Sequence, residues 1–104
     1  MPLSLEDAYL VLRKLVRRPN HVVMQEGAVI AWFFEPTSDA NIEYEIRLNY
    51  DGNRLNVSKV EYVQIQPPAT WDITKRWAGD PIVERVVKIA RDALELGTPD
   101  SGHL

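Results

Sequence analysis

The residues best able to do acid–base chemistry in this sequence are two histidines and two glutamates. His21 opens an apolar segment, and His103 is the penultimate residue of the chain. Neither has a serine, aspartate or glutamate at a spacing typical of a catalytic triad or a metal site. Glu43 and Glu45 alternate with apolar residues, which is typical of the solvent face of a sheet. The sequence therefore predicts no catalytic residue, no metal ligand and no cofactor site.

A second candidate group is basic. Four cations fall in a run of six residues at the end of one predicted helix, and two more follow much later in the chain. These six residues are Arg13, Lys14, Arg17, Arg18, Lys75 and Arg76. Such a set can neutralise several phosphates, although a net charge of -3 does not favour a protein whose whole surface binds nucleic acid. The competing interpretation is a solvated helix end whose cations complement the helix dipole.

The third candidate is the segment QPPATWDITKRWAGDP at residues 66–81, which holds two of the three tryptophans. Trp71 and Trp77 lie close to Asp72, Lys75 and Arg76. Long connections without regular structure are usually either functional or packed by their own side chains. Indoles beside cations are typical of protein-interface hot spots and of base-stacking sites. The segment is therefore the strongest binding candidate in the sequence.

Hydrophobic periodicity indicates the elements that would position these residues. An apolar stripe that begins at Leu5 predicts a helix over residues 4–18, with Ser4 as its N-cap. Branched and aromatic runs predict strands at residues 21–25 and 28–35. Strict alternation predicts a strand at residues 42–50.

The second half of the chain carries equally local signals. The pair Asp51-Gly52 predicts a hairpin into a return strand at about residues 54–66, whose alternation slips near Ser58 in the manner of a bulge. A second helix is expected to begin after its N-cap Asp80 and to end before Gly97.

These elements predict an α+β two-layer sandwich of order α-β-β-β-β-α, with a four-stranded antiparallel meander and two helices packed on one face. Residues 1–97 are expected to form a single domain, and residues 98–104 a flexible C-terminal tail. No internal repeat or second domain is indicated.

The strand at residues 28–35 is apolar on both of its faces, so both faces need cover. The helices can cover one face. The other face carries Trp32 and Phe34, and we expect the segment that bears Trp71 and Trp77 to fold back over it. If that segment does not, another protomer or a ligand would have to cover the exposed aromatic side chains.

Composition suggests a cellular setting. The sequence has no cysteine, which favours a reducing compartment, and its N-terminus lacks the order of charge, apolar run and cleavage site of a signal peptide. No stretch approaches the ~20 apolar residues of a membrane helix. The predicted localisation is therefore cytoplasmic, without a membrane or a metal as partner.

The function predicted from these features is that of a small non-enzymatic interaction module. It would bind a protein partner, or a second copy of itself as a homodimer, through an aromatic surface. The predicted protein-binding residues are Trp32, Phe34, Trp71, Asp72, Lys75, Arg76 and Trp77. The alternative is a nucleic-acid-binding domain that uses the six basic residues named above.

Overall fold

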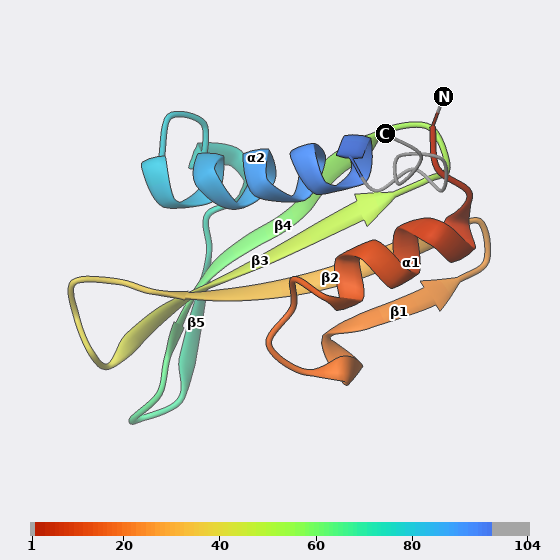
Figure 1. The fold of residues 1–104 in the computed structure, drawn as a ribbon. Coiled ribbons are helices and arrows are strands. Elements are labelled where there is room, and N and C mark those ends of the chain that lie inside the picture. Colours follow the sequence, from red (N-terminus) through yellow and green to blue (C-terminus); the bar gives the residue numbers. More distant parts are fainter. Residues whose placement is uncertain (1, 97–104) are drawn as a thin grey trace.

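The computed structural model describes residues 2–96 and shows an α+β fold in which two helices lie on one face of an antiparallel sheet (Figure 1). The sheet has five strands in the order β1-β2-β3-β4-β5. The predicted class, antiparallel topology and helix layer are confirmed, whereas the predicted number of four strands is wrong.

Helix α1 (Leu5–Arg13) begins as expected, because the Ser4 hydroxyl accepts a hydrogen bond of 3.1 Å from the amide of Asp7. It ends earlier than the predicted residue 18. Arg18 precedes a proline and has an extended backbone, which is the conformation that a following proline imposes. A short 3₁₀ helix (Pro19–His21) then leads into the sheet.

Strands β1 (Val22–Gln25) and β2 (Ala28–Pro36) form the first hairpin, and Gly27 in its turn has a φ of 75°. Strand β3 (Ile42–Tyr50) pairs with β2 on one side and with β4 (Leu55–Gln64) on the other. The predicted bulge is confirmed, because Arg47 pairs with Lys59 and Leu48 pairs with Val57, which leaves Ser58 without a partner in the register.

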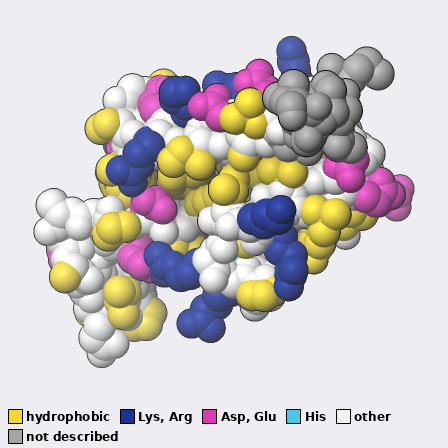
Figure 2. Space-filling model, viewed as in Figure 1, with side chains coloured by type: hydrophobic (Ala, Val, Ile, Leu, Met, Phe, Trp, Pro, Cys, Tyr) yellow, Lys and Arg dark blue, Asp and Glu magenta, His cyan; other side chains and the backbone are white. Residues whose placement is uncertain are grey.

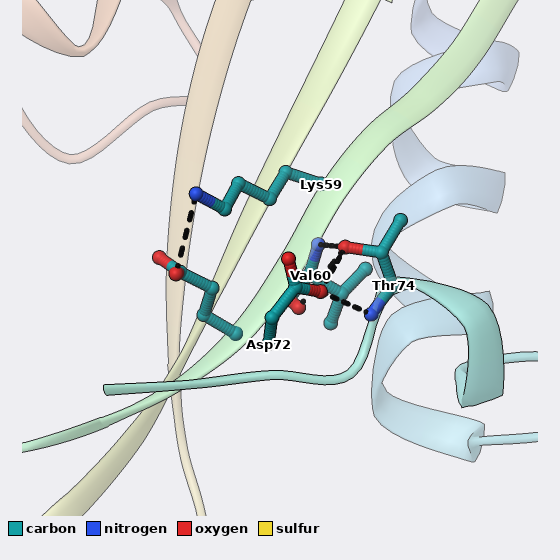
Figure 3. A network of polar contacts seen from close by, with 5 residues as sticks. Lys59, Val60, Asp72 and Thr74 are labelled. Carbon is teal, nitrogen blue, oxygen red and sulfur yellow. Dashed lines mark hydrogen bonds and ion pairs between the residues drawn. The ribbon is translucent and has the colours of Figure 1, made fainter.

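The strand that the sequence did not predict is β5 (Ala69–Asp72), which pairs with β4 and forms the far edge of the sheet. The side chain of Thr74 holds the C-terminal end of β5, as Figure 3 shows. The Thr74 hydroxyl accepts a hydrogen bond of 3.1 Å from the Val60 amide, and it donates one of 2.6 Å to Asp72. Thr74 thus takes the place of a strand partner for Val60 just after β5 ends.

Helix α2 (Pro81–Leu96) follows a second 3₁₀ helix (Thr74–Arg76), and its N-cap is the predicted Asp80. One Asp80 carboxylate oxygen accepts hydrogen bonds from the amides of Ile82 and Val83 at 2.9 and 3.3 Å. The predicted C-cap at Gly97 and the predicted flexible tail lie outside the described residues. Across residues 2–96, no helix is long and apolar enough to span a membrane.

The core lies between the helices and the sheet face that they cover. Its largest fully buried side chains come from both helices and from three strands: Leu12, Val29, Ile46, Leu48, Val60 and Val83. The other face of the sheet, called here the open face, has no helix over it among the described elements (Figure 1). The side of the sheet toward which a residue points therefore decides its environment.

Candidate functional site

The predicted aromatic surface is divided between the two faces of the sheet. Trp32 pairs with Arg47 and Phe34 pairs with Glu45, which places both aromatic side chains on the open face. Trp71 pairs with Tyr62, whose side chain is on the helix face. Because β5 lies at the opposite edge from β1, the tryptophan segment does not fold over Trp32 and Phe34. The expectation that it would cover them is wrong.

Cations, rather than the tryptophan segment, cover the aromatic rings of the open face. The Arg47 guanidinium lies 5.5 Å from the centre of the Trp32 ring. The Arg17 guanidinium lies 5.9 Å from the centre of the Phe34 ring and donates a hydrogen bond of 2.9 Å to the Phe34 carbonyl. The His21 ring lies 4.9 Å from Phe34. Cation–π and ring contacts therefore cover part of Trp32 and Phe34, the aromatic side chains for which the sequence predicted a covering segment.

The six basic residues do not form one surface. Helix α1, which leads into the Arg13–Arg18 cluster, packs on β1 and β2, whereas the 3₁₀ helix with Lys75 and Arg76 packs beside β4. Arg17 is also engaged, since it contacts Phe34 and lies 3.6 Å from the Glu43 carboxylate. The continuous phosphate-binding surface of the nucleic-acid interpretation is therefore not formed.

Three of the residues predicted to surround the tryptophans point elsewhere. Asp72 pairs with Glu61, so its side chain lies on the face opposite to Trp71. Its carboxylate accepts hydrogen bonds from the amide and the hydroxyl of Thr74, which lower the pKa of Asp72. Lys75 and Arg76 line a separate groove with Lys59. Trp77 is half-buried and packs against the core, so its role in the structure is a packing role.

The tryptophan that remains accessible belongs to a recess on the helix face, at the end of the sheet where α2 begins. The side chain of Trp71 is 47 % exposed. The recess has a volume of about 640 Å³, which is within the range of small-ligand pockets. We call it the aromatic recess and define it by its lining residues: Pro36, Thr37, Ser38, Asp39, Ile42, Tyr44, Tyr62, Trp71 and Ile82. Figure 2 shows hydrophobic side chains over the β2–β3 loop and the β4–β5 hairpin at this end of the molecule.

Two tyrosines from neighbouring strands line the recess beside Trp71. The rings of Tyr44 and Tyr62 are 5.2 Å apart and inclined by 51°, a tilted arrangement that aromatic pairs favour. The Tyr44 hydroxyl donates a hydrogen bond of 2.7 Å to Asp80 at the start of α2. Burial, together with this bond to a carboxylate, raises the pKa of Tyr44 well above its usual range. Tyr44 is therefore a neutral hydrogen-bond donor with a fixed ring.

Hydrogen bonds within the β2–β3 loop fix one wall of the aromatic recess. The Thr37 hydroxyl donates to the Ile42 carbonyl at 2.9 Å and accepts from the Asp39 amide at 3.0 Å. The Asn41 side chain then bridges to the β4–β5 hairpin, where it donates to the Gln66 carbonyl at 2.7 Å and accepts from the Gln66 amide at 3.0 Å. The loop and the hairpin that carries Trp71 are thereby tied together, so the recess is formed before any ligand arrives.

The possible acid–base residues show a different kind of environment. The His21 ring is tilted by 49° against Phe34, and its Nδ1 atom is buried without a hydrogen-bond partner among residues 2–96. Glu43 and Glu45 lie on the open face, as their alternation predicts. Within residues 2–96 there is no group of three or more histidine, aspartate or glutamate side chains placed to hold a metal ion. His103 lies outside the described residues.

Sequence reasoning missed most of the recess. Tyr44 and Ile42 carry a usable signal, since they belong to the apolar side of the strand at residues 42–50. Tyr62 and Ile82 carry similar signals in β4 and α2. No local pattern shows where α2 begins relative to these side chains. The recess depends on that position, because Ile82 at the start of α2 lines it together with Tyr44 and Tyr62.

Comparison with known proteins adds no relative to this description. Neither the models of protein families, nor the curated proteins, nor the solved structures include a match to this chain.

Proposed function

We propose that this chain is a non-enzymatic protein-interaction module whose partner docks into the aromatic recess, with Trp71 as the central contact. One observation carries this proposal: a tryptophan that is 47 % exposed lines an open recess of about 640 Å³. Tryptophan is enriched among residues that dominate binding energy, and such residues pair with pockets.

Burial of Trp71 by a partner would contribute substantially to affinity. About half of a tryptophan surface amounts to roughly 100 Å² of mainly apolar area, which corresponds to about 2–3 kcal/mol when it is removed from water. The Thr37 and Asn41 hydrogen bonds already hold the walls of the recess, so binding would add little ordering of the walls to the general cost of association.

The polar groups at the recess support binding rather than catalysis as its role. The Asp80 carboxylate accepts from Tyr44 and from two amides at the start of α2, and Thr37 is bonded within its own loop. These groups are committed to positioning the walls. The surface that they leave for a partner is mainly aromatic and aliphatic, with Ser38 and Asp39 on one wall, as at the centre and polar rim of an interface.

Selection of peptide ligands tests the proposal. Peptides from a random displayed library would be selected on the purified protein, and their binding sites mapped by changes in the ¹⁵N–¹H spectrum. We expect the Trp71 indole signal and the amides of Tyr44 and Tyr62 to shift, and Trp71→Ala to weaken binding at least tenfold, a factor that corresponds to ~1.4 kcal/mol.

A matched control uses Met24, which is 44 % exposed but lies on β1 at the other edge of the sheet. Met24→Ala should leave binding unchanged. Ligands that map elsewhere, or that bind Trp71→Ala with wild-type affinity, contradict the proposal. If the partner is a second copy of this chain, light scattering will give twice the mass of 11.9 kDa for the wild type and the monomer mass for Trp71→Ala.

A further inference from the structure

The chemistry of the aromatic recess favours one class of occupant. Three of its nine lining residues are aromatic, one is the carboxylate Asp39, and none is a lysine or an arginine. The faces of aromatic rings carry a partial negative charge, and a cation within about 6 Å of a ring centre is attracted to them. The recess therefore combines apolar walls with a negative potential.

The hydrogen bond between Tyr44 and Asp80 strengthens that potential. At 2.7 Å the Tyr44 hydroxyl donates its hydrogen to a carboxylate, which draws electron density toward the ring and its oxygen. Tyr62 is tilted against this ring at 5.2 Å, and Trp71 lies opposite Tyr62 across the β4–β5 pair. Among aromatic rings, indole attracts a cation most strongly. The most exposed ring of the recess, that of Trp71, is therefore also the one that attracts a cation most strongly.

Charges around the recess have the same sign. Asp39 lines it, and Asp80 and Glu84 lie at the start of α2, where their oxygens accept amide hydrogens and offset the positive end of the helix. A nearby cation, Arg85, is held by Glu35 at 2.8 Å. An anionic ligand would meet the Asp39 carboxylate and no lining lysine or arginine, whereas a cationic ligand would be attracted.

From these observations we infer that the partner places an alkylammonium group in the aromatic recess, carried on a methylated lysine side chain. This inference rests on the proposed function and names the partner's chemistry. Methylation matters because a bare ammonium is a strongly hydrated point charge that requires hydrogen-bond acceptors. The recess offers three aromatic side chains, and the Thr37 hydroxyl and one Asp39 carboxylate oxygen already accept amide hydrogens.

The experiment compares a cation with a neutral group of the same shape. Wild-type protein would be titrated with a short neutral peptide that contains trimethyllysine, and with the same peptide carrying a tert-butyl group in place of the trimethylammonium. Unmodified lysine peptide and free choline form two further arms. Binding would be followed at the Trp71 indole signal and at the amides of the recess.

We expect the trimethyllysine peptide to bind roughly fivefold or more tightly than its tert-butyl analogue, the size that a cation–π contact supports. It should also bind more tightly than the lysine peptide, whose bare ammonium is strongly hydrated, and more tightly than choline, which lacks the backbone contacts of a peptide. Trp71→Phe should keep most of this preference, and Trp71→Leu should abolish it while retaining apolar contact. Asp39→Asn, which keeps an acceptor for the Asn41 amide, should weaken only the cationic ligands.

Several outcomes would overturn the inference. Equal binding of the tert-butyl analogue shows an apolar recess without cation preference, and it leaves the proposed function intact. Choline that binds as tightly as the peptide assigns the site to a free small ammonium instead of a protein side chain. Shifts confined to residues outside the recess, or no shifts with any arm, refute an alkylammonium site, while the peptide selection separately decides whether the recess binds proteins.

Discussion

Tyr44 of β3 donates a hydrogen bond of 2.7 Å to Asp80, the residue that caps helix α2. One carboxylate thus joins the sheet to the helix at the point where the aromatic recess begins. Its first oxygen accepts from amides of the first helical turn, and its second oxygen accepts from the phenol. The position of α2 relative to the recess therefore depends on two residues that are 36 positions apart in the sequence.

A double-mutant cycle should reveal this coupling. We expect Tyr44→Phe to lower the free energy of unfolding by about 1 kcal/mol. Asp80→Ala should lower it by about 2 kcal/mol, because it removes the cap as well as the acceptor. The double variant should lose about 1 kcal/mol less than the sum, measured by urea denaturation. Asp80→Asn is the control that keeps a capping oxygen, and additive losses in the cycle would contradict the coupling.

The two tryptophans of the 66–81 segment should differ sharply when each is truncated. Trp77 packs against the core, so Trp77→Ala should lower the free energy of unfolding by about 2–3 kcal/mol through the cavity that it leaves. Trp71 is 47 % exposed, so Trp71→Ala should change it by only about 0.5 kcal/mol. Denaturation monitored by far-ultraviolet circular dichroism measures both. A large loss for Trp71→Ala would mean that this side chain is structural.

Local signals were sufficient for much of the fold. Ser4 and Asp80 mark the starts of both helices because each side chain satisfies amides of its own first turn. Alternation in residues 42–50, the Asp51-Gly52 turn and the slip near Ser58 mark the central hairpin and its bulge. These features need only neighbours in the sequence, which is why they could be predicted.

The features that could not be predicted depend on distant partners. Strand β5 has four residues and follows two prolines, and it is ordered by pairing with β4 and by Thr74. Its register decides that Trp71 lies on the helix face, because a shift of one residue would reverse the side. Helix α1 ends before Leu15 although the apolar spacing continues. The residues beyond its end include Arg17, whose contacts are with β2 and β3.

The hydrogen bonds of Thr74 predict a measurable change in the titration of Asp72. They lower the pKa of Asp72 in the folded protein, so the carboxylate favours folding above its unfolded pKa. This contribution is lost as pH falls through the folded pKa. In Thr74→Val the pKa of Asp72 should rise toward its ordinary value, as followed by carboxyl NMR signals. Asp51, whose pKa is lowered by amides of Asn53 and Arg54 instead, is the internal control and should not change.

Arg17 should stabilise the fold through its guanidinium geometry more than through its charge. Its contact with Glu43 is 3.6 Å long and exposed, so the ion pair contributes little. Its hydrogen bond to the Phe34 carbonyl and its position over the Phe34 ring require a planar, fork-shaped donor. We expect Arg17→Ala to lower the free energy of unfolding by about 1 kcal/mol, and Arg17→Lys to lose most of the same amount.

Urea denaturation at low and at high salt distinguishes the two contributions. A difference between wild type and Arg17→Lys that persists in high salt supports a role for the guanidinium contacts with Phe34, because salt screens exposed ion pairs. Arg18→Ala is the matched control, since Arg18 makes no side-chain hydrogen bond or ion pair with any residue between 2 and 96. If Arg17→Lys unfolds at the wild-type urea concentration, charge alone explains the contact and the shape of the guanidinium over Phe34 has no energetic role.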